Sequence, residues 1–197
     1  EPMTTAALNQ IRSHHAAIAK VFGSDFKMII PMHYNTALNT ANTMDFFEFV
    51  KDSVNVWCPH TYFFNTYAEK LAYPNLMFQF YSQKLEQTLG VFRDRMAAQQ
   101  AEGDEVWWYV TRYPHNPEIT LSIDDESVKH RLLFWQQKLY NVDGFLYYMV
   151  NEWEDAKNWT KKYEHEVLGT VVDTYGNGVL IYPGGALPEY IEKYGSD

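Results

Sequence analysis

The sequence predicts an α/β fold with a parallel sheet, and three observations support this prediction. Short apolar runs rich in β-branched and aromatic residues recur, at Val106–Val110 and Gly144–Val150 among others. Between these two runs, Val128–Tyr140 carries apolar residues at helical spacing. Polar and aromatic residues follow each run at once, as they do at the ligand-binding ends of parallel sheets. A strand, a helix and a second strand in this order make a βαβ unit.

The first predicted element is an N-terminal helix. Thr4 or Thr5 is a suitable N-cap, the helix runs to about Phe22, and Gly23 suits the position after its end. We expect its apolar face to consist of Leu8, Ile11, His15, Ile18 and Phe22.

Two further βα repeats follow this helix. The predicted strands are Phe26–Met32 and Val54–Trp57, the second closed by Pro59. A short helix is predicted at Thr43–Val50 and a long helical region at about Asn75–Ala101. The chain thus alternates helix and strand up to the βαβ unit, whose helix has Val128, Leu132, Trp135 and Leu139 as its apolar residues.

The chain changes character after Trp153. Glu154–Glu166 is charged and is expected to form a surface helix. Gly169–Pro183 contains two β-prone runs around Gly176-Asn177-Gly178, which indicates a hairpin or a covering loop. Pro188–Tyr194 is expected to form a short terminal helix.

Composition excludes several classes of function. The net charge of −9 argues against binding to nucleic acid or to anionic membrane surfaces. No apolar run approaches the length of a transmembrane helix. Cys58 is the single cysteine and is expected to be buried and inert. The sequence offers no tight cluster of metal ligands and no phosphate-binding loop, so we expect no metal and no cofactor.

Five segments carry a resemblance to a known family. They are Val56-Trp57-Cys58-Pro59, Gly103-Asp104-Glu105-Val106-Trp107-Trp108-Tyr109, Arg131-Leu132-Leu133-Phe134-Trp135, Asp143-Gly144-Phe145-Leu146-Tyr147-Tyr148 with Asn151 and Trp153, and Gly178-Val179-Leu180-Ile181-Tyr182-Pro183-Gly184. In this order they resemble the C-terminal catalytic domain of glycoside hydrolase family 123. The resemblance implies a β-N-acetylgalactosaminidase on a TIM-type (β/α)8 barrel, with a catalytic Asp-Glu pair at the end of the fourth strand.

The resemblance also implies which part of a barrel the chain supplies. The chain opens with Glu1-Pro2, as if it began inside the Asp-Glu motif with the aspartate missing. We therefore expect residues 1–168 to form the C-terminal half of the barrel, about strands five to eight. Residues 169–197 would form a C-terminal hairpin or loop and a short helix. An open half-barrel exposes two sheet edges, so we expect a missing N-terminal half or, alternatively, self-association.

By the same resemblance, Glu1 is similar to the family's general acid/base. The expected mechanism is retaining and substrate-assisted: the 2-acetamido carbonyl of the sugar attacks the anomeric carbon, and the neighbouring carboxylate orients the acetamido group. This differs from the usual glycosidase, in which the protein supplies the nucleophile. Without its partner aspartate, the chain by itself is expected to be inactive.

Aromatic and polar residues at the strand ends are the predicted substrate-binding groups, because flat rings stack on the CH faces of sugars. Strand alternation sends neighbouring residues to opposite faces, so each of these aromatics has core packing as its alternative. The predicted residues are His33, Tyr34, Trp57, His60, Trp108, Tyr109, Tyr147, Asn151 and Trp153.

Two other functions remain open from the sequence. Glu152 could serve a double-displacement glycosidase as its nucleophile, although Glu152, Glu154 and Asp155 also suit a solvated charge run. A carbohydrate-binding or scaffold domain that lacks the acid is the non-enzymatic alternative. The compartment is unsettled, with a secreted or periplasmic location as one expectation.

Overall fold

The computed structural model describes residues 5–32, 46–61, 64, 93–111, 119–151, 163–167, 170–174, 176 and 178–181. The chain divides into two compact units, which differ from the sequence-based division at residue 168. The first comprises Glu1–Tyr109 and Gln136–Leu146, and the second comprises Val110–Trp135 and Tyr147–Asp197. Among the described residues, no helix is both long and apolar enough to cross a membrane.

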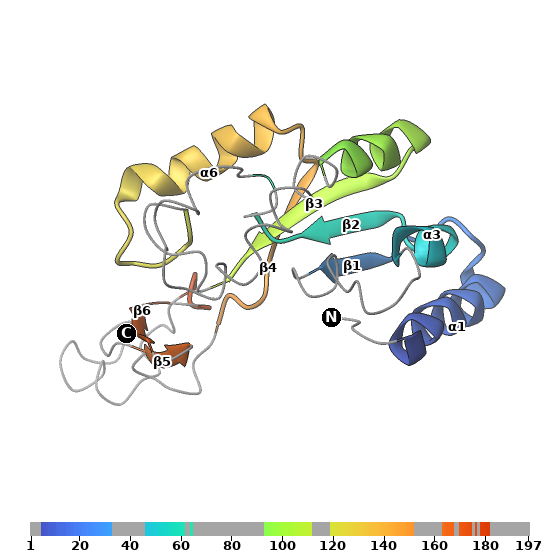
Figure 1. Cartoon of the computed structure of the whole chain (residues 1–197), viewed down its shortest axis with the longest axis horizontal. Helices are drawn as coiled ribbons and strands as arrows, with labels where there is room; N and C mark the ends of the chain where they lie inside the picture. The colour runs from blue at the N-terminus through green and yellow to red at the C-terminus, as the bar shows by residue number, and fades with distance from the viewer. Residues whose placement is uncertain are drawn as a thin grey trace, which may run out of the picture. The chain divides into compact units, whose positions relative to one another are not determined.

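A four-stranded parallel sheet is the centre of the fold (Figure 1). The strands are β1 (Ile29–Met32), β2 (Val56–Pro59), β3 (Glu105–Val110) and β4 (Gly144–Tyr147), and they lie in that order. Parallel pairing joins Ile30 to Trp57 and Trp57 to Val106. The predicted α/β class and the order of the strands are confirmed, whereas the half-barrel stays a prediction.

β1 begins three residues later than predicted, and a side chain explains the difference. The Asn55 carboxamide accepts a hydrogen bond from the Met28 N–H at 2.7 Å and donates one to the Phe26 carbonyl at 2.9 Å. The backbone of Phe26–Met28 is therefore bonded partly to a side chain rather than to a regular ladder. Two other strand ends differ from the prediction. β2 extends to Pro59 and not to Trp57, and β4 ends at Tyr147 and not at Val150.

Helices lie in the predicted stretches where the structure describes them, whereas residues 75–92 of the predicted long helical region and the predicted helix Pro188–Tyr194 lie outside the described residues. α1 spans Thr5–Phe22, and Gly23 follows it with φ of 80° and an N–H that donates to the Ala19 carbonyl at 2.9 Å. A positive φ is easy for glycine, which explains why the helix ends here. Its expected apolar face is only partly correct, because Phe22 is 75% exposed. The remaining helices are α3 (Phe46–Val50), the 3-10 helix η1 (Lys51–Ser53), the helix at 93–102 and α6 (Ser127–Leu139).

The apolar side predicted for α6 is wrong. Val128, Trp135 and Leu139 are 53%, 70% and 75% exposed, whereas Leu133 is fully buried. Leu133 and Trp135 are two positions apart, which is about 200° around a helix. Burial of Leu133 therefore turns the predicted apolar stripe towards solvent.

The two faces of the sheet carry different side chains. On one face, the Trp57 ring lies 5.2 Å from Phe47 of α3, and the Trp108 ring lies 6.3 Å from Tyr140 after α6. Helices thus cover this face. Alternation sends His60 and Tyr109 to the opposite face, and an isolated parallel bridge pairs these two residues.

The second unit contains a hairpin outside the predicted place. β5 (Tyr163–Val167) pairs antiparallel with β6 (Thr170–Thr174), so these paired strands both precede Gly176, around which the sequence predicted a hairpin or a covering loop. The Val179 N–H donates to the Gly176 carbonyl at 3.0 Å, which makes a turn there. The expected surface helix over Glu154–Glu166 is wrong for Tyr163–Glu166. The sequence YEHEV has glutamate at every second position, which is a period-two signal of a strand that the charge of this segment obscured.

Gly144 at the start of β4 packs so closely against the Trp107 ring that no side chain fits there. A Cβ at this position would lie 2.3 Å from a ring carbon of Trp107. Gly144→Ala should therefore lower the free energy of unfolding by about 1–3 kcal/mol through overpacking, as measured by urea denaturation. In a Trp107→Ala background the same change should cost far less, and an equal cost in both backgrounds would contradict this explanation.

Candidate functional site

The carboxyl ends of β1, β2 and β3 converge on one backbone atom. The carbonyl oxygen of Met32 accepts a hydrogen bond from the His60 N–H at 3.2 Å and a second from the Tyr109 hydroxyl at 3.4 Å. Met32 ends β1, His60 follows β2, and Tyr109 lies near the end of β3. Three separate strand ends are thereby held together at the edge where parallel α/β proteins place their ligands.

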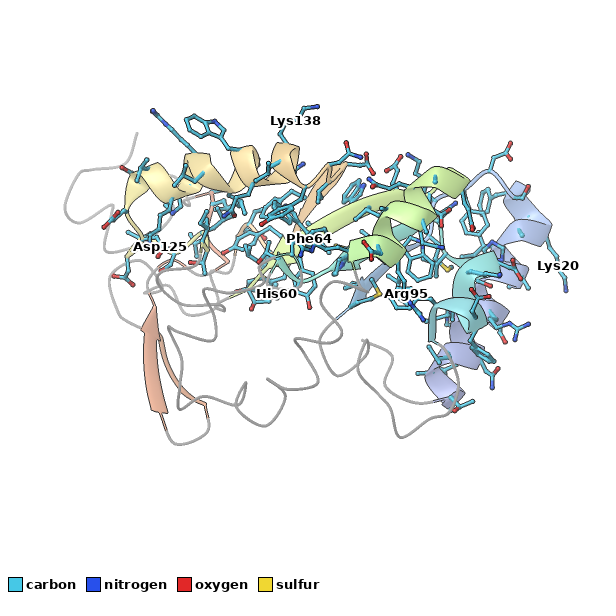
Figure 2. All side chains as sticks on the ribbon, turned by 45° about the horizontal axis from the view of Figure 1, so that its top comes forward. Lys20, His60, Phe64, Arg95, Asp125 and Lys138 are labelled. Atoms are coloured by element: carbon cyan, nitrogen blue, oxygen red, sulfur yellow. The ribbon has the colours of Figure 1, made fainter. Side chains whose placement is uncertain are left out.

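His60 places an imidazole ring at this point. Its ring meets that of Tyr109 edge to face, with centroids 4.9 Å apart and an interplanar angle of 73°. The Thr61 hydroxyl lies 3.4 Å from Nδ1 of His60, close enough for a long hydrogen bond that favours one tautomer. His60 and Tyr109 are only 1% and 5% exposed, so both are well fixed. Figure 2 shows His60 and Phe64 in the segment after β2.

The two predicted site tryptophans lie on the other, helix-covered face. Trp57 is fully buried, and its indole N–H donates to Asp104 at 2.7 Å. Trp108 packs edge to face against Phe64, with ring centroids 5.5 Å apart. These contacts favour packing, the alternative that the sequence left open for both residues.

Tyr147 and Asn151 belong to the second unit. The Tyr147 hydroxyl accepts a hydrogen bond from the Gly178 N–H at 2.9 Å, and burial raises the pKa of this hydroxyl. Asn151 forms an antiparallel bridge with Val179 and its side chain is exposed. Tyr147 and Asn151 therefore both contact the segment around Gly178–Val179.

The comparisons with known proteins point to one family. Residues 34–190 match the family description "Glycoside hydrolase 123, catalytic domain". The chain belongs to this family. No match was found among curated proteins. In this glycoside hydrolase family 123 domain, His60 and Tyr109 lie within the matched residues, whereas Glu1 lies before the match begins.

The other predicted residues fall outside the described part of the family 123 domain. They are Glu1, His33, Tyr34 and Trp153, together with the alternative carboxylates Glu152, Glu154 and Asp155. Their roles stay predictions. The described residues include no group of three or more His, Cys, Asp or Glu side chains that could hold a metal ion.

Two features of the strand-end site were not predicted from the sequence. Thr61 is not among the predicted binding residues, yet its hydroxyl is the neighbour of His60 Nδ1. The role of the Met32 carbonyl could not be predicted, because a backbone acceptor leaves no signal in residue identity. The sequence signal that could have pointed to Thr61 is its place beside His60, directly after the Pro59 that closes the predicted strand.

The buried thiol of Cys58 on β2 should make the stability of the fold depend on pH. Cys58 is fully buried, and burial raises the pKa of its thiol from 9.0 to about 12. The folded state then keeps the thiol neutral while the unfolded state ionises it, so stability is fully present below about pH 9 and is lost as the pH rises towards 12.

The measurement compares the wild-type domain with Cys58→Ala by urea unfolding. The wild-type protein should lose about 1.4 kcal/mol more than the variant between about pH 8 and pH 10. Subtracting the variant removes the effect of lysines and tyrosines that also titrate in this range. Parallel pH curves for the two proteins would contradict a protected thiol.

Proposed function

We propose that this glycoside hydrolase acts on terminal β-linked N-acetylhexosamine, and specifically on N-acetylgalactosamine. The match to the family 123 catalytic domain over residues 34–190 is the observation that carries the proposal. The five segments that resemble the family's β-N-acetylgalactosaminidases support the choice of sugar. The parallel sheet adds support, since its strand ends bring a histidine and a tyrosine to one ligand-binding edge.

The proposed mechanism is retaining and substrate-assisted. The acetamido carbonyl oxygen of the substrate attacks the anomeric carbon, the bond to the leaving oxygen breaks, and a general acid protonates that oxygen. Water then opens the oxazolinium-like intermediate, and the same residue acts as base. We assign the acid/base to Glu1 by resemblance alone, because Glu1 lies outside both the matched and the described residues.

His60 and Tyr109 have complementary roles in this proposal. A Thr61 hydroxyl that donates to Nδ1 of His60 leaves the proton on Nε2, which can then donate to a sugar oxygen. The Tyr109 hydroxyl donates to the Met32 carbonyl, and in this proposal its oxygen also accepts a hydrogen bond from a sugar hydroxyl. Because both side chains are nearly fully buried, a sugar reaches them only after local opening of the protein.

A substitution at His60 tests its proposed role. In the intact hydrolase, His60→Phe should lower kcat/KM for a chromogenic β-N-acetylgalactosaminide by at least about tenfold, because a hydrogen bond to the sugar is lost. Phe47→Leu is the matched control, since Phe47 is buried on the helix-covered face against Trp57. We expect this control to lower thermal stability and leave kcat/KM within about twofold. If both variants keep full activity, His60 is a packing residue.

A second experiment tests the proposal that the 197-residue chain alone is inactive. The described sheet ends in β1 on one side and β4 on the other, and an open parallel sheet admits water to its strand ends. The test compares hydrolysis by this chain and by a longer chain that carries a full barrel. Activity of the short chain that survives Glu1→Gln would overturn both the inactivity and the assignment of Glu1. Sugar binding without hydrolysis by either chain would favour the carbohydrate-binding alternative.

A further inference from the structure

A cavity of about 360 Å³ lies within the first unit, lined by the helix at 93–102, the last residue of α6 and the two residues after it. Small-molecule sites usually have volumes of about 300–1,000 Å³, so this cavity is large enough for a small ligand. Val106 of β3 also lines it, and Val106 shares a face of the sheet with Trp108, two residues further along the strand. The cavity is therefore on the opposite face from His60 and Tyr109 and is separate from the strand-end site.

Two aromatic rings form part of the cavity wall. Phe64 and Tyr140 both line the cavity, and their ring centroids are 5.6 Å apart. Trp108 packs edge to face against both rings, with centroid distances of 5.5 Å to Phe64 and 6.3 Å to Tyr140. Figure 2 shows Phe64 close to the end of α6 that Lys138 marks. Rings held in this way are fixed apolar surfaces on which a ligand can pack.

Hydrogen bonds connect the two sides of the cavity. The Gln100 carboxamide donates to the Asn141 carbonyl at 2.7 Å and to the Asp143 carboxylate at 2.9 Å. Gln100 lines the cavity from the helix at 93–102, and Asn141 lines it from the turn after α6. Because these bonds span the two sides, the cavity exists in the free protein and a ligand would order little of the chain on binding.

One guanidinium and one carboxylate at the cavity have no other role in the described structure. Arg93 and Asp94 line the cavity, and their side chains form no ion pair or hydrogen bond within the part of the chain that the structure describes. Adjacent residues of a helix do not face each other, which explains why the two charges are not paired. Together they add no net charge, and the whole chain carries a net charge of −9, so an anionic ligand is disfavoured.

We propose that this cavity binds a neutral sugar residue. A sugar hydroxyl both donates and accepts hydrogen bonds, so one sugar can donate to the Asp94 carboxylate and accept from the Arg93 guanidinium. The CH face of the same sugar packs against the aromatic wall formed by Phe64 and Tyr140. A single sugar makes few contacts, so we expect a dissociation constant on the order of 1 mM. The site does not rest on the proposed activity.

Two neighbouring alanines provide a matched pair of variants that tests the site. Ala97 and Ala98 are both exposed on the helix at 93–102, but only Ala97 belongs to the cavity lining. Ala97→Phe should fill the cavity and weaken the binding of galactose at least about tenfold, whereas Ala98→Phe should leave it unchanged. The measurement is an NMR titration of the backbone amides of the 197-residue chain with galactose, in which Gln100 and Asn141 report on this cavity and His60 reports on the strand ends. Circular dichroism melting should show that both variants are folded.

A second pair of variants and a charged probe test the class of ligand. Asp94→Ala should weaken galactose binding, whereas Asp52→Ala, at an exposed aspartate that also follows a cationic residue, should not. Galacturonate should bind more weakly than galactose, because its carboxylate is repelled by Asp94. Unchanged amide signals of Gln100 and Asn141 up to about 20 mM galactose would overturn the proposal, as would undiminished binding by Ala97→Phe. Tighter binding of galacturonate than of galactose would overturn the assignment to a neutral sugar.

Discussion

The Met32 carbonyl is the single acceptor on which the candidate site depends. It receives the His60 N–H and the Tyr109 hydroxyl, and so fixes the ends of β1, β2 and β3 relative to one another. A carbonyl oxygen has two lone pairs, and both lone pairs of the Met32 carbonyl accept a hydrogen bond here. The position of His60 follows from this arrangement, since its backbone is bonded to β1 while its ring rests on Tyr109.

Strand alternation then decides which aromatic residues can serve a ligand. Trp57 and Trp108 share one face, where Phe47 of α3 packs against Trp57 and Phe64 after β2 packs against Trp108. His60 and Tyr109 face the other way. On that second face, the Trp107 indole N–H donates to Glu105 at 2.9 Å and its ring covers Gly144. Hydrogen bonds from Lys27 and Trp107 hold the pKa of Glu105 below its usual range, so this end of β3 is polar and anchored.

Much of the fold could be predicted from the sequence because its signals are local. The helix that ends at Gly23, the order of the four strands and the helix before β4 all follow from periodicity and capping. Signals that depend on partners could not be predicted. The side-chain bonds of Asn55 delayed β1, and the choice of Leu133 as the buried residue of α6 exposed the stripe that periodicity had marked as apolar.

The site was less predictable than the fold. Residue type and position drew attention to His60, Tyr109, Trp57 and Trp108 together, and only the direction of each side chain separates them. Tertiary pairing determines that direction: the bridge between His60 and Tyr109 fixes one face, and the pairing of Trp57 with Val106 fixes the other. The resemblance to glycoside hydrolase family 123 could be recognised from the order of five motifs and not from any single residue, and the family match confirms it.

The most direct test of the central claim is a crystal structure of the intact hydrolase with a galactose-configured thiazoline, a stable mimic of the oxazolinium-like intermediate. The account predicts that the sugar binds at the carboxyl ends of β1–β3, with an oxygen within hydrogen-bonding distance of His60 Nε2 or the Tyr109 hydroxyl. A sugar bound away from these strand ends, with His60 and Tyr109 still buried beneath other side chains, would contradict it.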